Sequence, residues 1–315
     1  LSLSESHIGE NKDGNTSPDG TAITGSVSIS APTITLSKDS FITSKGSVDI
    51  QSNTISMAPT AEGELNWIKG QTVNISNDNL EGIDGNLAIT GGQITTIGTE
   101  VGNDINISSS TGLEIEGVKE IDAGKGNVNI STGLGSNSTI QGTPISGNTI
   151  SFVGNANEDN KDKGFGTITI SDSTVTAGDD SDTITGGKIN IGTGVNVVVS
   201  NNASLTANQG TNDESTGIDV NGGKLTIEAG GVVESGNNVD VTGGGSIDFT
   251  PGTGVGTEPG KLIAGGSVTV GGDKNGSSIN VGTDSQGNSI GVIVTGKEDS
   301  FITSKGSVDI QSNTI

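Results

Sequence analysis

The sequence predicts an all-β fold, namely a parallel β-helix (β-solenoid) of about 14 coils with roughly 18–23 residues each. Three observations predict it. Only 29% of the 315 residues are hydrophobic and 2% aromatic, whereas an ordinary globular domain has roughly 45–50% apolar residues. The apolar residues alternate with polar ones in short runs along the whole chain. These runs recur at intervals in the low twenties, so stacked coils can share one thin aliphatic core.

The expected strands are runs that are apolar at every second position, which is the period of a strand with one buried face. They lie at 47–51, 72–76, 104–108, 127–131, 167–171, 188–191, 224–228, 246–249 and 267–270. Gly, Asn, Asp and Ser separate them and supply turns and positive-φ corners. No segment has an apolar 3.6-residue period long enough to predict a helix. The polar positions of these runs are expected to form ladders on the outer faces.

The spacing of the strands favours a solenoid over other all-β folds. Comparable runs start at positions 104, 127, 149, 167 and 188, and this regular recurrence suits one coil per interval. A sandwich or a propeller would need more aromatic residues and longer strands. With about 4.8 Å between stacked strands, about 14 coils make a rod of about 65–70 Å.

The domain organisation follows from this alternating pattern and from one exact repeat. Residues 1–20 are expected to be a polar lead-in or loop, and residues 21–315 one continuous solenoid. Residues 39–55 return identically as 299–315. Either only this short stretch is duplicated, without a longer repeat, or the chain is part of a tandem repeat of about 260 residues. We favour the tandem repeat.

Two polar stretches, 155–163 and 208–216, interrupt the alternation and are expected to be loops that leave the corners of the solenoid. Loops on a rigid scaffold often carry binding specificity. The candidate binding residues in them are Asn155, Glu158, Asp159, Asp162, Asn212, Asp213 and Glu214. The alternative is that both are solvated loops without a partner.

The charge and composition exclude some functions. The formal net charge is −23, and all 14 basic residues are Lys because the sequence contains no Arg. Such a chain repels phosphate backbones and has no guanidinium to read them, so nucleic-acid binding is excluded. No run approaches the roughly 18 apolar residues of a membrane span. The absence of Cys excludes disulfides and thiolate metal sites.

Catalysis on polysaccharides is the main alternative, because lyases and hydrolases of this kind often use β-helices. The sequence Gly178-Asp179-Asp180 superficially resembles the paired-Asp motif of polygalacturonases. Paired carboxylates can act as general acid and general base at a glycosidic bond. That motif needs a His and basic partners. This chain has only His7, far away in the sequence, and no Arg. We therefore expect no enzyme activity.

The same stretch, 177–187, resembles the calcium-binding nonapeptide of RTX β-rolls. Asp179, Asp180 and Asp182 are the candidate ligands, because clustered carboxylate oxygens on a tight turn suit a hard cation. The RTX pattern needs consecutive copies, whereas one degenerate copy is present here, with Asp180 where a Gly is expected. No cofactor is expected to be required, and a calcium-dependent scaffold is the second alternative.

Trp67 is the only Trp and is a candidate for stacking on a sugar ring. An aromatic residue that simply packs in the core or on a face of the solenoid is the alternative.

The runs at 46–50, 223–233 and 265–270 resemble the repeats of filamentous-haemagglutinin-like exoproteins. The resemblance covers nearly the whole chain from about Thr21, and related repeats occur in autotransporter passenger domains. It implies a right-handed parallel β-helix shaft of a bacterial surface or secreted protein, exported with an outer-membrane secretion partner. It also implies a role in adhesion or contact-dependent competition. The family's N-terminal secretion domain is not evident here, and no site residue is carried over.

From these observations we expect an extracellular structural and adhesive shaft or filament segment. Its expected partners are other copies of itself, arranged end to end or side by side, and the glycans or proteins of other cells. Rigidity and many weak contacts would supply the mechanism.

Overall fold

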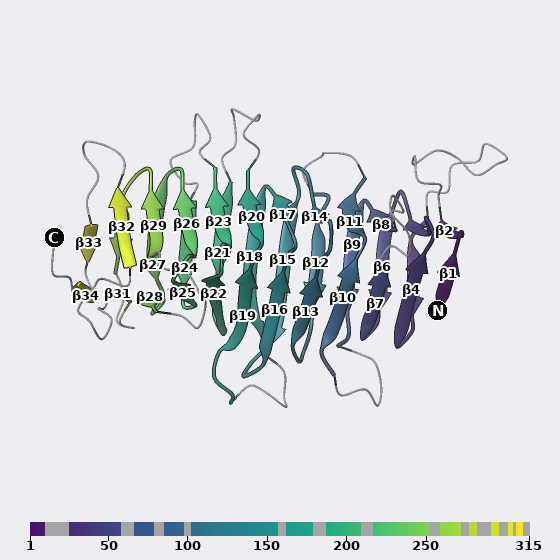
Figure 1. Cartoon of the computed structure of the whole chain (residues 1–315), viewed down its shortest axis with the longest axis horizontal. Helices are drawn as coiled ribbons and strands as arrows, with labels where there is room; N and C mark the ends of the chain where they lie inside the picture. Colours follow the sequence, from purple (N-terminus) through teal and green to yellow (C-terminus); the bar gives the residue numbers. More distant parts are fainter. Residues whose placement is uncertain are drawn as a thin grey trace.

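The computed structural model describes residues 1–9, 25–57, 66–78, 85–97, 102–156, 162–178, 187–208, 217–251, 259–271, 277–281, 291–295, 302–304 and 307–310. These residues form 34 strands, arranged in three parallel sheets that we call A, B and C. The strands follow one another along a single axis from the N-terminus to the C-terminus (Figure 1). The predicted all-β parallel solenoid is confirmed.

The strands fall into three sets. Sheet A contains β1 (Ser2–Ser4), β4 (Thr33–Ser37), β7 (Thr54–Met57), β10 (Leu87–Gly91), β13 (Leu113–Glu116), β16 (Asn137–Gln141), β19 (Gly166–Ser171), β22 (Val195–Ser200), β25 (Lys224–Glu228), β28 (Ser246–Thr250), β31 (Ser278–Val281) and β34 (Ser307–Ile310). Sheet B contains β2 (His7–Gly9), β5 (Phe41–Thr43), β8 (Trp67–Gly70), β11 (Gln93–Thr96), β14 (Glu120–Asp122), β17 (Ile145–Gly147), β20 (Thr174–Ala177), β23 (Ser204–Ala207), β26 (Val232–Ser235), β29 (Gly260–Ala264) and β32 (Gly291–Thr295). Sheet C contains β3 (Val27–Ser30), β6 (Ser47–Gln51), β9 (Thr72–Ser76), β12 (Ile105–Ser108), β15 (Asn127–Gly133), β18 (Thr149–Asn155), β21 (Lys188–Ile191), β24 (Gly217–Asn221), β27 (Asn238–Thr242), β30 (Val268–Val270) and β33 (Ile302–Ser304).

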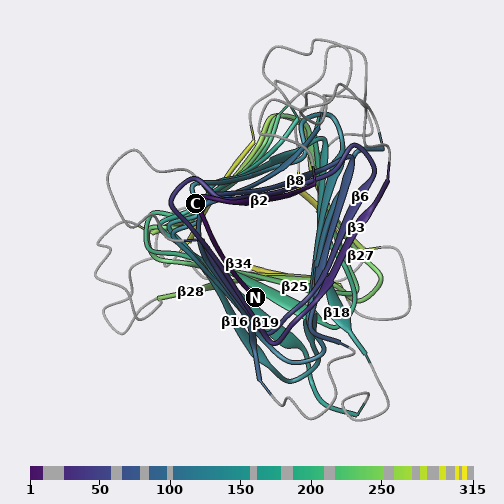
Figure 2. The ribbon, with the colours of Figure 1, turned by 90° about the vertical axis from the view of Figure 1, so that its right-hand side faces the viewer.

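Each strand is hydrogen-bonded to the strand three places later in the chain, so three consecutive strands make one coil. Viewed along the axis, the coils superimpose as a triangle with one sheet on each side (Figure 2). The twelve strands of sheet A, stacked at about 4.8 Å, give a prism about 53 Å long.

One aliphatic core fills the prism. Burial alternates along the strands, as in β6, where Val48 and Ile50 are buried and their neighbours are not. The inward side chains stack in register from coil to coil, and one column of sheet A runs through Ile55, Ile89 and Ile115. Among the described residues, all the buried aliphatic side chains except Val198 belong to a single cluster. The low apolar content is therefore sufficient, because each side chain is covered by the coils above and below it.

The coils are fewer and longer than the sequence predicts. Ile29 is in register with Ile50, whereas Ile150 is in register with Ile189, which lies almost twice as far along the chain. The prediction of about 14 coils of roughly 18–23 residues was wrong because all three faces share the same alternating pattern. The run that starts at 167 lies in sheet A, between runs of sheet C that start at 149 and 188, so one coil was counted as two.

The solenoid also begins earlier than predicted. Strand β1 pairs with β4, and β2 pairs with β5, so residues 2–9 belong to the first coil rather than to a polar lead-in. The apolar residues Leu3 and Ile8 explain this, because they stand in register with Leu36 and Ile42. The remaining predicted lead-in, from residue 10 to residue 20, lies outside the described residues.

The two identical segments occupy different faces. In the first copy, the residues Phe41–Thr43 form β5 in sheet B and Ser47–Gln51 form β6 in sheet C. In the second copy, Ile302–Ser304 lie in sheet C and Ser307–Ile310 in sheet A. One sequence therefore fits at least two faces, because each face requires the same alternation.

Buried Asn side chains join described residues that are separated by a gap in the description. Asn66 donates to the carbonyl of Met57 at 3.0 Å, and its Oδ1 accepts from the Ser40 amide at 3.0 Å. Asn77 donates to the Gly85 carbonyl at 2.8 Å, and Asn103 donates to the Ile97 carbonyl at 2.9 Å. These bonds satisfy backbone groups at the corners, where the strand ladder ends.

Candidate functional site

A ladder of side-chain amides runs along the outer face of sheet C. Asn74 Nδ2 donates to Asp49 Oδ1 at 2.6 Å. Asn106 donates to Asn74 Oδ1 at 2.8 Å, and Asn129 donates to Asn106 Oδ1 at 2.8 Å. These residues are register partners on successive coils, so their spacing follows that of the backbone. The predicted polar ladder is confirmed on this face, and it adds lateral hydrogen bonds to those of the strands.

The same row becomes acidic toward the C-terminal coils. It continues through Ser151, Asn190, Asp219 and Asp240, and Asn190 donates to Ser151 Oγ at 3.3 Å. Lys188 Nζ lies 3.5 Å from Asp219 Oδ2. Asp219 Oδ1 is buried and has no hydrogen-bond partner among the described residues. The burial of this oxygen is therefore not offset by a hydrogen bond, which costs stability.

Partial burial raises the pKa of Asp240 above the ordinary value for Asp. The neighbouring Asp219 carboxylate also raises this pKa, whereas a hydrogen bond from Thr269 and the charge of Lys188 lower it. Two carboxylates thus stand side by side on adjacent strands with one Lys nearby, which makes this part of the face electronegative.

We expect Asp240→Asn to stabilise the fold at neutral pH by less than about 1 kcal/mol, since Asp240 is partly solvated. The folded pKa is raised, so the wild-type protein loses stability as the pH rises from the ordinary Asp value through the raised value. The variant has no ionisable group at this position and therefore avoids this loss of stability. Its Asn oxygen can still accept a hydrogen bond from Thr269. Urea denaturation at a series of pH values from about 3 to 7 measures the difference.

Asp248→Asn is the matched control, since Asp248 also faces outward but is paired. Its Oδ2 lies 2.6 Å from Lys224 Nζ, and its Oδ1 accepts a hydrogen bond from Asn280. We expect this variant to lose stability at neutral pH, because the ion pair is removed. Equal effects of the two substitutions would contradict the explanation.

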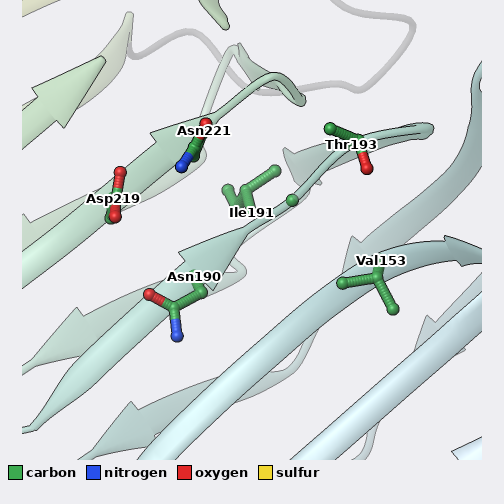
Figure 3. A pocket seen from close by; sticks show the side chains of 7 residues that line it. Val153, Asn190, Ile191, Thr193, Asp219 and Asn221 are labelled. Atoms are coloured by element: carbon green, nitrogen blue, oxygen red, sulfur yellow. The ribbon is translucent and has the colours of Figure 1, made fainter. Parts of the chain in front are cut away.

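Beside the acidic part of the ladder lies a hollow of about 340 Å³, which we call the Gly192 hollow. Its lining residues are Val153, Asn190, Ile191, Gly192, Thr193, Asp219 and Asn221. They come from three successive coils, with Asp219 and Asn221 on β24, Asn190 and Ile191 on β21, and Val153 on β18 (Figure 3). The hollow offers amide, hydroxyl and carboxylate groups around an apolar side chain.

The register explains why the hollow exists. Phe152, Ile191 and Val220 are buried register partners, so the residues that follow them, Val153, Gly192 and Asn221, form the next outward row. Gly192 contributes no side chain between its two neighbours. A Cβ at this position would stand 3.0 Å from Val153 Cγ1, so a side chain here would press on the Val153 wall of the hollow.

Trp67 lies on the outer face of sheet B, at the start of β8. Its ring packs edge-on against Phe41, with centroids 5.4 Å apart and an interplanar angle of 67°, and Lys69 Nζ lies 5.9 Å from the ring centroid. Trp67 Nε1 is buried without a hydrogen-bond partner among the described residues. The ring thus packs on the face of the solenoid, and sugar stacking by Trp67 stays a prediction.

The structure places two of the predicted loop residues. Asn155 ends β18 and donates to Asp78 Oδ2 at 3.5 Å, so it is tied to the corner of a distant coil. Asp162 is exposed in a turn before β19. The other predicted binding residues, Glu158, Asp159, Asn212, Asp213 and Glu214, and the calcium candidates Asp179, Asp180 and Asp182 lie outside the described residues.

The hollow was not predicted from the sequence. Its residues belong to predicted strands, the run that starts at 149 and the run 188–191, and to the segment 217–221, which alternates in the same way. The available signal was the Gly that follows 188–191, at a position where 104–108 and 127–131 each have a Ser. That signal acquires meaning only when the strand register is known.

Among the described residues, no group of three or more His, Asp or Glu side chains is arranged to hold a metal ion. The described residues also contain no helix long and apolar enough to cross a membrane. No family model, curated protein or solved structure matches the chain.

Proposed function

We propose that the chain is a structural and adhesive shaft segment of a bacterial surface or secreted protein, and that it is not an enzyme. The observation that carries this proposal is the continuity of the three parallel sheets, which run along one axis over a single core. Such a prism resists bending because every coil is hydrogen-bonded along three faces to the next.

The outer faces support the adhesive part of the proposal. Polar side chains repeat at the strand spacing along the amide ladder, so a ligand on another surface meets many similar groups in a row. Weak contacts of this kind add up to strong attachment when they are made simultaneously. The high negative charge keeps neighbouring rods apart unless a specific contact holds them. Extracellular export and the right-handed winding belong to the same proposal through the resemblance to filamentous-haemagglutinin-like repeats.

The shape of the isolated chain in solution tests the proposal that it forms a stiff shaft. Negative-stain electron microscopy and small-angle X-ray scattering are expected to show stiff rods with a core length of about 50–55 Å, or multiples of it if copies join end to end. Melting followed by circular dichroism is expected to be unchanged by a calcium chelator. Compact globular particles would contradict the proposal, and a large loss of stability on chelation would favour the calcium-dependent scaffold.

Attachment and activity assays test the remaining parts. Latex beads coated with the chain are expected to adhere to cells or to immobilised glycans more than beads coated with serum albumin do. Incubation with acidic and neutral polysaccharides is expected to release no new reducing ends or unsaturated products. Their appearance would establish the enzymatic alternative instead.

A further inference from the structure

The Gly192 hollow interrupts an otherwise filled outer row of sheet C. Between Gln51 and Thr242 this row is Gln51, Ser76, Ser108, Ser131, Val153, Gly192, Asn221 and Thr242. Gly192 is the one residue of this series that lacks a side chain. Its backbone conformation is not left-handed, so the position does not require Gly for that reason. A Cβ here would stand 3.0 Å from Val153 Cγ1, so the close approach of Val153 favours a residue without a side chain, and the hollow lies beside this contact.

The walls of the hollow are of two chemical kinds. Val153 is 39% exposed, whereas most aliphatic residues in the described part of the chain are buried, and it forms an apolar wall beside Gly192. Asn190, Asp219 and Asn221 surround it with amide and carboxylate groups. Such planar groups can each bond a pair of neighbouring hydroxyls, because they offer two polar atoms in one plane.

The Asp219 carboxylate determines the kind of ligand. Its Oδ1 is buried, whereas its side chain is 29% exposed, so Oδ2, which lies 3.5 Å from Lys188 Nζ, is the oxygen that a ligand can reach. A carboxylate forms strong, charge-assisted hydrogen bonds with hydroxyl donors. Asp240 in the next coil and the net charge of −23 disfavour an anionic ligand. A divalent cation prefers about six to eight oxygens with several carboxylates, and one carboxylate lines the hollow.

We propose that the Gly192 hollow binds one uncharged pyranose unit of a glycan. A pyranose has a face of C–H groups, which fits against Val153 and the Gly192 backbone, and a rim of hydroxyls, which the amides and the Asp219 carboxylate bond. The volume of about 340 Å³ is at the lower end of the roughly 300–1,000 Å³ of small-molecule sites. This inference rests on the proposed adhesive function, since it names a ligand class for the adhesive surface.

Saturation-transfer-difference NMR tests the site with methyl α-D-glucopyranoside, methyl β-D-galactopyranoside and methyl α-D-mannopyranoside as probes. We expect saturable binding of at least one of them, with a dissociation constant on the order of 1–10 mM, because the hollow is open and one ring makes few contacts. Glucuronic acid is expected to bind at least several-fold more weakly, because its negative carboxylate is repelled by that of Asp219. Absence of saturable binding of all three neutral glycosides would overturn the proposal.

Two variants locate the binding. Gly192→Val fills the hollow and is expected to weaken binding by about tenfold or more, whereas Ser76→Val, in the same row on β9, is expected to leave it unchanged. Asp219→Asn preserves the shape and is expected to weaken binding several-fold, which keeps the test valid if Gly192→Val fails to fold. Thermal melting by circular dichroism checks the fold of each variant. Equal binding by the folded Gly192→Val variant and the wild-type chain would overturn the proposal.

The bead assay separates this inference from the proposed function. Beads that carry Gly192→Val and attach as well as wild-type beads would overturn the hollow as the adhesive contact while leaving the adhesive shaft standing. Glycoside binding that Gly192→Val abolishes, together with wild-type beads that do not attach, would uphold the site and contradict adhesion.

Discussion

Replacing Ile130 with Asp is expected to lower the free energy of unfolding by more than about 4 kcal/mol. Ile130 is fully buried in β15 and stands in register between Ile107 and Phe152. A carboxylate at this position would lie inside the aliphatic column with no partner to offset its desolvation. Because each coil contacts only its neighbours along the axis, the damage is expected to centre on β12, β15 and β18.

Hydrogen exchange followed by mass spectrometry measures this result. Amides of β12, β15 and β18 are expected to lose protection in the variant, while those of β25 and β28, several coils away, keep most of theirs. Thr149→Asp is the control, because Thr149 faces outward on β18 and is in register with Lys188. We expect it to change stability by about 0.5 kcal/mol or less. Unchanged protection at β15 in the Ile130 variant would contradict the description of the core.

The alternation of apolar residues made the strands predictable, but it did not show which strands stack on one another. The runs at 72–76 and 104–108 were expected as strands, and they form β9 and β12. The run at 167–171 was also identified, but it lies on a different face from the runs before and after it. Three chemically equivalent faces cannot be distinguished by a period of two. The identical segments on different faces show the same degeneracy.

The hollow was unpredictable for a related reason. It brings together residues that are distant in the sequence, as the register pairs Phe152 with Ile191 and Ile191 with Val220 show. More of the chain separates the first pair than the second, so a fixed spacing in the sequence does not give the register. Only the register shows that Gly192 stands between Val153 and Asn221. Trp67, by contrast, was identified from its residue type alone, and its packing against Phe41 also depends on the register.

Gly92→Ala is expected to destabilise the fold by about 2–4 kcal/mol. Gly92 lies at the corner between β10 and β11 with a φ of +62°, a conformation that an L-residue adopts only with strain. An added Cβ would overlap Met57 Cβ and would stand 2.8 Å from the carbonyl oxygen of Asn66. Both contacts are shorter than real Cβ atoms show, and the second is with backbone that the Asn66 side chain helps to fix. The corner must therefore shift.

Fluorescence of the single Trp measures this effect locally, since Trp67 is in register with Gln93, the residue that follows Gly92. We expect a lower midpoint of urea denaturation in Gly92→Ala, detected both by Trp67 fluorescence and by circular dichroism. Gly85→Ala is the matched control, because the nearest atom to its added Cβ is 3.8 Å away and its φ is not left-handed. It is expected to be neutral or slightly stabilising, through the reduced freedom of the unfolded chain. A Gly92 variant as stable as the Gly85 variant would mean that the corner yields without cost, and the stacking of β8 under β11 would then not depend on a glycine at this turn.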